Sequence, residues 1–306
     1  MDNNRFKLHH DNVVRNVSKV IVGKDEIITL TFICFVCSGH VLLEDFPGTG
    51  KTMLLRAFAA TIGGGFKRVQ FTPDLLPSDL TGIHFFSQKA GDFTFRPGPL
   101  FSNMVLGDEI NRATPRTQSA LLEAMEERQI TVDGETFKLD EPFMVMATQN
   151  PIEMYGTFPL PEAQLDRFMM RLALGRMSRE DEKRIVARRS TLEIVESLER
   201  VLAPDDIRFL KNELMSVSVS DDVTEYILSL VEKTRERFTA GVSTRGAIAL
   251  YKASQAAAAC NGRDYAIPED VRFVAPHILG HRLTEGGGSG EIADIIGSVP
   301  VPLEKA

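Results

Sequence analysis

Short apolar runs alternate with longer amphipathic or polar segments over residues 1–176. The runs cover residues 40–44, 67–71, 104–108, 143–148 and 170–174. Apolar runs of this length, bounded by turn residues and separated by segments long enough for a helix, are typical of buried strands in a parallel sheet. The pattern therefore predicts an α/β fold, with a five-stranded parallel sheet inside an αβα sandwich.

After residue 176 the apolar spacing becomes helical, and strand-like runs largely disappear. Helices are predicted over residues 180–191, 204–215, 221–238, 244–261 and 268–279. Pro204 and Pro268 stand at expected helix starts, and Gly241 and Gly262 stand at expected stops. We expect a second, all-helical domain over residues 177–306.

Two segments interrupt this organisation with hairpin signals. Residues 84–96 carry alternating aromatic residues on both sides of a glycine-containing turn, and residues 132–135 form a second turn between apolar positions. Both patterns predict β-hairpins. The four phenylalanines of the first hairpin exceed what two strands can bury by themselves. This hairpin is therefore either a contact surface for a partner or an ordinary surface hairpin.

Residues 44–52 read EDFPGTGKT and follow the first apolar run. A glycine turn between a strand and a helix lets backbone N–H groups face the phosphates of a nucleotide. Lys51 is the expected partner of the β- and γ-phosphates, and Thr52 is the expected Mg²⁺ ligand. The pattern GxxxxGK[ST] has glycine where this chain has Asp45, so the motif alone leaves open a glycine turn without a ligand.

The third apolar run leads into two adjacent carboxylates, Asp108 and Glu109. Metal-dependent hydrolysis of a phosphoanhydride needs one group to hold Mg²⁺ and one to orient and deprotonate the attacking water. We assign Asp108 to the metal and Glu109 to the water. A solvated turn is the ordinary alternative for such a pair, but the phosphate-loop pattern upstream favours the chemical role.

Two further polar positions follow later strands. Asn150 comes after the fourth run, where an amide can bond both the γ-phosphate and the attacking water. Arg167 ends a short helix before the fifth run, and in a ring of subunits such an arginine can reach the γ-phosphate of the neighbour. Arg112 is a rival for that contact. An ordinary surface pair between Asp166 and Arg167 is the alternative for this arginine.

Four more segments accompany the phosphate loop: FTPDLLPSDLTG at 71–82, GDEINRA at 107–113, QSALLEAM at 118–125 and LDRF at 165–168. Together they resemble the MoxR family of AAA+ ATPases over nearly the whole chain. The resemblance implies ATP and Mg²⁺ as cofactors and a homo-oligomeric ring, usually of six subunits. It also implies chaperone-like work, in which ATP hydrolysis remodels, matures or metallates a client protein, often with a von Willebrand factor A domain protein.

The resemblance implies that residues 1–176 are the nucleotide-binding domain and that residues 177–306 are the helical lid. Arg245 resembles the lid arginine, called sensor 2, that reaches the γ-phosphate of its own subunit. The implied nucleotide contacts are Val22, Gly23, Pro47, Gly48, Thr49, Gly50, Lys51, Thr52 and Met53. The implied catalytic residues are Glu109, Asn150, Arg167 and Arg245, with Thr52 and Asp108 as metal ligands.

The formal charge of −7 is shared between the two expected domains, −3 over residues 1–176 and −4 over residues 177–306. Because neither domain is basic, binding of nucleic acid is not expected. A nucleic-acid motor remains the alternative function, since helicase-like AAA+ rings share a hairpin insertion. A nucleotide-gated scaffold that scarcely turns over is a third class, against which the pair of Glu109 and Asn150 argues.

The longest apolar stretch, residues 27–37, contains two threonines and is too short to span a bilayer. The polar N-terminus lacks the apolar core of a secretory signal. We therefore expect no membrane insertion and a cytoplasmic location. Cys34 and Cys37 form a CxxC without the partners of a zinc site, so packing inside a helix is the expected role.

Overall fold

The computed structural model describes residues 3–45, 48–89, 91–149, 156–188, 190–283 and 289–302. Its strands are β1 Val41–Glu44, β2 Phe66–Gln70, β3 Gly82–Ser87, β4 Asp92–Pro97, β5 Met104–Asp108, β6 Gln129–Val132, β7 Glu135–Lys138, β8 Met144–Gln149 and β9 Met170–Leu172. Its first α-helices are α1 Asn3–Ser18, α2 Asp25–Val36, α3 Lys51–Ile62, α4 Pro77–Thr81, α5 Pro115–Glu127 and α6 Glu162–Leu165. The later ones are α7 Arg179–Val186, α8 Thr191–Glu196, α9 Pro204–Leu214, α10 Asp221–Arg237, α11 Thr244–Cys260, α12 Pro268–Leu279 and α13 Ser289–Ser298. Three short 3₁₀ turns are η1 Pro99–Phe101, η2 Ile110–Arg112 and η3 Gly280–Arg282.

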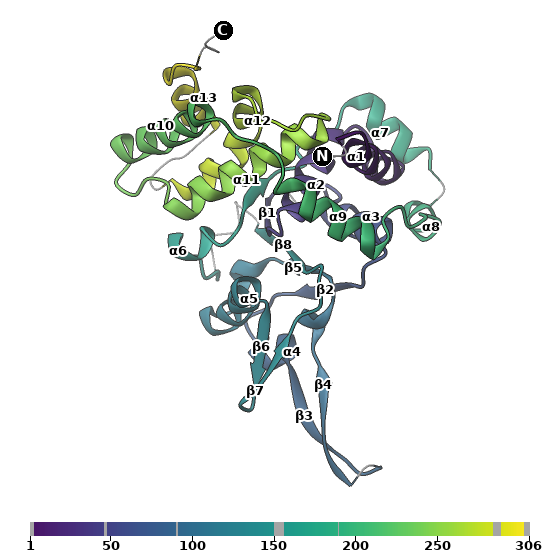
Figure 1. Cartoon of the computed structure of the whole chain (residues 1–306). Coiled ribbons are helices and arrows are strands. Elements are labelled where there is room, and N and C mark those ends of the chain that lie inside the picture. The colour runs from purple at the N-terminus through teal and green to yellow at the C-terminus, as the bar shows by residue number, and fades with distance from the viewer. Residues whose placement is uncertain are drawn as a thin grey trace.

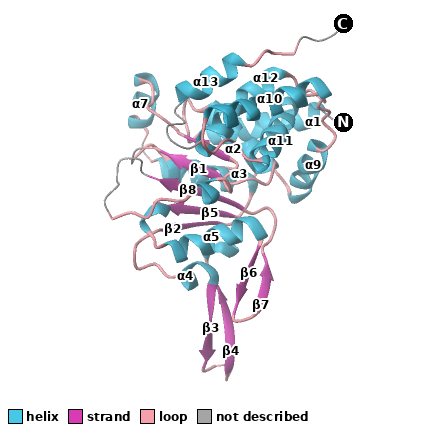
Figure 2. Cartoon of the chain, turned by 90° about the vertical axis from the view of Figure 1, so that its left-hand side faces the viewer, coloured by secondary structure: helices cyan, strands magenta, loops and turns pink. Residues whose placement is uncertain are grey.

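Five strands form one parallel sheet in the order β2-β5-β8-β1-β9 (Figure 1). Successive side chains of β1 enter different hydrophobic clusters, Val41 and Leu43 on one face and Leu42 on the other, as the two-residue period of a strand requires. The first cluster includes residues of α1–α3 and α9–α13, and the second includes residues of α4 and α5. Helices thus cover both faces (Figure 2), which confirms the predicted αβα sandwich.

The predicted lid helices are confirmed by α9, α10, α11 and α12, whose bounds differ from the expected ones by at most one residue. The predicted helix over residues 180–191 is wrong in its second half, because α7 ends at Val186 and α8 begins at Thr191. The side chain of Ser190 accepts a hydrogen bond from the Glu193 N–H and so caps a new helix. The first hydrophobic cluster contains residues from both sides of position 176, and so shows no separation of two cores there. A domain division at that residue stays a prediction.

Helix α2 is buried on nearly all sides. Cys34 packs inside the first hydrophobic cluster, as expected for the CxxC pair, and burial raises the pKa of Cys37 to about 12. Both thiols are therefore held in the protonated, unreactive form at neutral pH. Among the described helices, none combines the length and the apolarity that a bilayer crossing requires.

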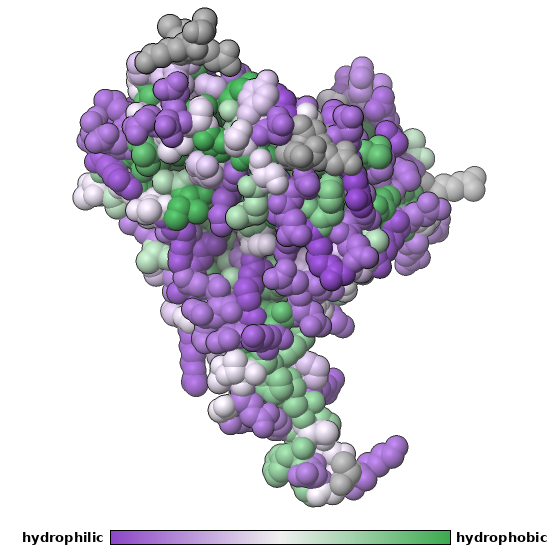
Figure 3. Space-filling model, viewed as in Figure 1, coloured by the Kyte–Doolittle hydropathy of each residue, from purple (hydrophilic) through white to green (hydrophobic). Residues whose placement is uncertain are grey.

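Both predicted hairpins are confirmed: β3 pairs with β4, and β6 pairs with β7. The β3–β4 hairpin projects away from the sheet (Figures 1 and 2). At its base Phe95 stacks on Phe137 of β7, with ring centroids 4.4 Å apart. Towards its tip Phe86 and Phe93 contact each other and are 55% and 65% exposed. Figure 3 shows the apolar surface along this projection.

His40 is buried where the chain enters β1. Its Nδ1 accepts a hydrogen bond of 2.9 Å from the Val145 N–H, so its Nε2 carries the proton and donates to the carbonyl oxygen of Met125 at 3.0 Å. The neutral imidazole therefore ties β1 to β8 and to the end of α5. Burial, with repulsion from Arg128, lowers the pKa of His40 to about 3.

We predict that acid destabilises the fold through His40. The unfolded chain takes up a proton near the ordinary histidine pKa of 6.5, whereas the folded chain excludes it until about pH 3. Stability from this group is therefore complete above pH 6.5 and is lost as the pH falls below it, by about 1.4 kcal/mol per pH unit. Between pH 7 and pH 5, urea unfolding should show a loss of about 2 kcal/mol that His40→Gln lacks. Equal pH dependence in both proteins would contradict the assignment.

Candidate functional site

The glycine turn after β1 has the backbone that a phosphate loop needs. Gly48 and Gly50 have φ angles of 82° and 97°, in the left-handed region that favours glycine, and α3 begins directly at Lys51. Lys51 Nζ donates to the carbonyl oxygen of Asp45 at 2.7 Å. The predicted contact Pro47 lies outside the described residues. The four residues of this turn that the structure describes lead the chain from a buried strand into the positive end of a helix.

Asp45, the departure from the glycine pattern, has a structural role. The residue is 5% exposed, and its Oδ2 accepts a hydrogen bond of 2.8 Å from the Gly175 N–H beyond β9. The carboxylate thus joins the start of the phosphate loop to the chain that leaves the sheet. An Asp at this position braces the loop through its side chain, which a glycine lacks.

The two predicted carboxylates stand at the end of β5. Asp108 is nearly buried, and its Oδ1 accepts a hydrogen bond of 2.7 Å from the hydroxyl of Thr148 on β8. Its Oδ2 accepts two bonds from the Arg68 guanidinium on β2, at 2.6 and 3.0 Å. Asp108 is therefore held from both neighbouring strands.

Glu109 is fixed by its backbone as well as by its side chain. Its φ of 56° is unusual for a residue other than glycine, and its N–H donates to the Thr148 hydroxyl at 2.8 Å. Its Oε2 accepts hydrogen bonds from Gln70 at 2.7 Å and from Arg112 at 2.9 Å. Arg112, the rival trans arginine, thus pairs with Glu109 of its own subunit.

A cavity of about 350 Å³ joins the glycine turn to the carboxylates. It is lined by Gly48, Gly50, Lys51, Thr52, Met53, Arg68, Gln70, Asp108, Glu109 and Thr148. Seven of the predicted residues meet here, while Val22, Gly23, Thr49, Arg167 and Arg245 are not among the lining residues. Gly23 lies instead beside Asp181 of α7, and Asn150 lies outside the described residues.

The oxygens in this cavity suit Mg²⁺. Thr52 and Asp108, which both line the cavity, offer hard oxygen donors, and Mg²⁺ binds in proteins through one or two such groups together with substrate phosphates. The Arg68 side chain that pairs with Asp108 is 51% exposed, so this ion pair is weak enough to rearrange when a cation binds. The residues present therefore fit a magnesium–nucleotide complex.

Sequence reasoning missed Arg68, Gln70 and Thr148. Gln70 and Thr148 lie at or next to the carboxyl ends of β2 and β8, the two strands that flank β5, and Arg68 lies in the middle of β2. For Gln70 and Thr148 the available signal was a position near the end of a predicted strand, and Arg68 lies two residues before Gln70 on the same face of that strand. The missing piece was the strand order, which brings these ends beside Asp108.

The two remaining predicted arginines meet away from this cavity. Glu126 near the end of α5 has its Oε2 3.0 Å from Nε of Arg167, and its Oε1 accepts a hydrogen bond from Nη2 of Arg245. Asp166 does not pair with its neighbour Arg167, which removes the surface pair considered above. It accepts hydrogen bonds from Arg282 at 2.6 Å and from the Ser243 hydroxyl at 2.9 Å.

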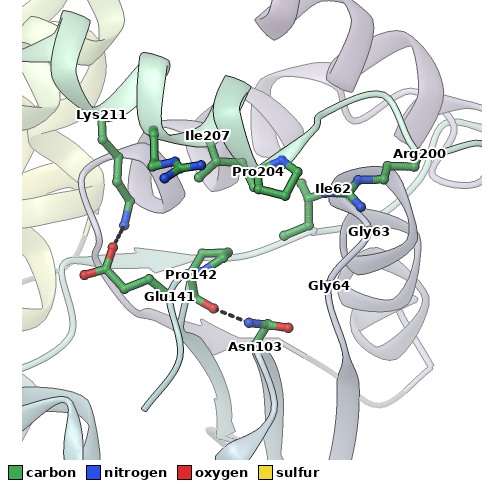
Figure 4. A pocket seen from close by; sticks show the side chains of 11 residues that line it. Ile62, Gly63, Gly64, Asn103, Glu141, Pro142, Arg200, Pro204, Ile207 and Lys211 are labelled. Carbon is green, nitrogen blue, oxygen red and sulfur yellow. Dashed lines mark hydrogen bonds and ion pairs between the residues drawn. The ribbon is translucent and has the colours of Figure 1, made fainter. Parts of the chain in front are cut away.

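A larger cavity, of about 430 Å³, lies between α9 and the segments that enter β2, β5 and β8 (Figure 4). It is therefore at the amino ends of the strands, opposite the glycine turn. Its charged groups are paired locally, since Lys211 bonds Glu141 at 2.7 Å and Arg200 bonds the Leu202 carbonyl oxygen at 2.6 Å. The smaller cavity is the candidate nucleotide site, because ligands of open α/β sheets bind at the carboxyl ends.

Comparison with known proteins agrees with this geometry. The model of the ATPase family associated with various cellular activities (AAA) matches residues 40–170, and the AAA lid domain model matches residues 232–296. The chain is similar to a candidate ATPase from Cytophaga hutchinsonii whose crystal structure has a TM-score of 0.89 and 38% sequence identity. The match covers 99% of this chain and 97% of that one.

Three curated relatives extend the comparison. Protein YeaC of Bacillus subtilis, which is uncharacterized, is 48% identical over 96% of this chain and 95% of its own length. Chaperone MoxR1 of Mycobacterium tuberculosis is 38% identical over 89% of this chain and 75% of its own length. Protein MoxR of Methylorubrum extorquens is 31% identical, with coverage of 88% and 85%. With the glycine turn and the carboxylate pair, these matches show that the chain is an ATP hydrolase that belongs to the MoxR family of AAA+ ATPases.

Proposed function

We propose that this chain works as a homo-oligomeric ring, of six subunits, in which Mg²⁺-dependent ATP hydrolysis remodels, matures or metallates a client protein. The observation that carries the catalytic part is the convergence of Lys51, Thr52, Asp108 and Glu109 on one cavity. The mechanical part is supported by the relative named a chaperone. In this proposal a von Willebrand factor A domain protein is the adaptor.

Each residue of the cavity has a role in this proposal. The glycine turn and the first N–H groups of α3 hold the phosphates, while Lys51 balances their charge. Thr52 and Asp108 hold Mg²⁺, which when bound withdraws charge from the phosphate oxygens. Glu109 takes the proton of the attacking water. Asn150 keeps its predicted role at the γ-phosphate.

The residues that hold Glu109 complete the arrangement. Gln70 donates to its carboxylate, and Thr148 fixes its backbone, so the base is oriented before the nucleotide arrives. Preorganisation of this kind lowers the cost of reaching the transition state. In the ring, Arg167 reaches the γ-phosphate of the neighbouring subunit and stabilises the charge that develops there.

Glu109→Gln tests the role of the base. The variant should bind ATP with unchanged affinity, since the phosphate contacts remain, but hydrolysis should fall at least about 100-fold because the base is lost. Calorimetry and a phosphate-release assay measure the two quantities. Lys51→Ala is the contrasting variant, whose ATP affinity should fall about 10- to 100-fold with the loss of a charge-assisted bond. A Glu109→Gln rate within threefold of the wild-type rate would refute the assignment.

Mixed rings test whether Arg167 acts across the interface. Arg167→Ala and Lys51→Ala subunits should each be nearly inactive, the former by roughly 10³-fold. In mixed rings some interfaces combine an intact phosphate loop with an intact arginine, so activity should exceed that of either parent. Arg112→Ala is the control, because Arg112 pairs with Glu109 of its own subunit and should not complement. Complementation by Arg112→Ala alone would transfer the trans role to that residue.

The β3–β4 hairpin is proposed to contact the client or the adaptor. A Phe86→Ser/Phe93→Ser variant removes the exposed pair near its tip, and we expect unchanged melting temperature and basal hydrolysis. Placed in a Glu109→Gln background that traps ATP, the same pair of changes should reduce the protein captured from a cell extract. Phe95→Ala is the matched change at the base, and it should lower the melting temperature because Phe95 stacks on Phe137. Undiminished capture by the tip variant would make the hairpin a structural element.

A further inference from the structure

Glu126 is the meeting point of two arginines that come from different parts of the fold. Arg167 follows α6 beside the last strand of the sheet, whereas Arg245 lies in the first turn of lid helix α11. One oxygen of the Glu126 carboxylate faces each guanidinium group. Two positive side chains 78 positions apart in the sequence (167 to 245) therefore point at one negative group.

The chain around the two arginines keeps their distance fixed. Asp166, the residue before Arg167, accepts a hydrogen bond of 2.9 Å from Ser243, which is also the N-cap of α11. Its other oxygen accepts a bond of 2.6 Å from the buried Arg282. The backbone segments that carry Arg167 and Arg245 are thus joined by buried or half-buried polar contacts, and only the ends of the two side chains need a further anchor.

The contact with Glu126 leaves both guanidinium groups able to bind an anion. Arg167 contacts the carboxylate through Nε, and Arg245 contacts it through one terminal nitrogen, Nη2. An arginine has five N–H donors in a planar fork. One carboxylate therefore orders both side chains and leaves further N–H donors on each guanidinium for a phosphate.

We propose that Glu126 is a positioning residue, which holds Arg167 and Arg245 together so that both reach the same γ-phosphate of the neighbouring subunit. The inference rests on the proposed function, namely on ring assembly and on the trans role of Arg167. Arg245, which does not line the cavity of its own subunit, then acts beside Arg167 rather than as a separate sensor.

The contact of Glu126 with the two arginines orders their side chains but is weak enough to be replaced. All three side chains are about one-third to one-half exposed, and ion pairs in such positions are weak and screened by salt. A phosphate with more than one negative charge, approached in a closed interface, replaces the carboxylate as the main partner. What Glu126 supplies is order in two long side chains, whose immobilisation would otherwise oppose binding of the transition state.

The test is the Glu126→Gln variant, which keeps the size of the side chain and removes its charge. We expect kcat to fall about five- to tenfold, the effect of leaving one or two such side chains unordered. The KM for ATP, ring assembly and melting temperature should stay unchanged, because the residue does not touch the cavity that holds the nucleotide. Wild-type kcat, or a higher one, would overturn the proposal.

Glu123→Gln is the matched control. Glu123 and Glu126 both line a cavity of about 200 Å³ beside Arg167, separate from the one at the glycine turn. Glu123 lies one helical turn before Glu126, and among the described residues it has no ion-pair partner. Glu123→Gln removes one negative charge beside Arg167, as Glu126→Gln does, but leaves the contact of Glu126 with the two arginines intact. The kcat should therefore not fall. An equal fall in both variants would assign the effect to local charge and overturn the positioning role.

Two combinations separate this inference from the proposed function. In an Arg167→Ala background, Glu126→Gln should lower kcat less than it does in the wild type, because one of the side chains that it orders is gone. In mixed rings with Lys51→Ala subunits, Glu126→Gln subunits should regain activity, since their defect lies in what they present to the neighbour. If Arg167→Ala complements Lys51→Ala but Glu126→Gln does not, Glu126 has no trans role. If neither complements, the proposed trans mechanism itself fails.

Discussion

The register of β5 between β2 and β8 is the constraint on which the candidate site depends. Gln70 stands opposite Asp108 across one strand pair, and Thr148 lies on the other side at the same level. A slip by one residue in either strand would turn these polar side chains to the opposite face of the sheet. The buried apolar side chains of β5 and β8 enforce the register of that pair, which also places the hydroxyl of Thr148 between Asp108 and the backbone of Glu109.

The charges of the cavity are balanced within one subunit by contacts that are easily exchanged. Arg68 pairs with Asp108, and Arg112 pairs with Glu109, each through a side chain that is roughly half exposed. Such pairs contribute little to stability, typically about 1 kcal/mol or less. Phosphates can therefore pair with these arginines, and a divalent cation can bind a carboxylate, without disturbing the packed sheet below them.

A different kind of contact joins the sheet to the helical part of the chain. The guanidinium of Arg282 is nearly buried and donates to the Asp166 carboxylate and to the carbonyl oxygens of Phe168 and Met169. Removing one partner of a buried charge destabilises the fold strongly. The contact between Arg282 and Asp166 is therefore harder to exchange than the exposed ion pairs of the cavity. It places the segment before β9 and the start of α11 in one unit, and this unit carries both arginines that face Glu126.

The sequence by itself determined the strands, the hairpins, the glycine turn and the carboxylate pair, because each depends on residues close together in the chain. Local patterns also predicted most lid helices, but missed the new start at Ser190, where a capping side chain outweighs helical periodicity. Only the tertiary structure brought Thr148 beside Asp108 and Glu126 beside Arg245. Such contacts depend on strand order and helix packing, and hydrophobic periodicity reports which face of an element is buried but not which element covers it.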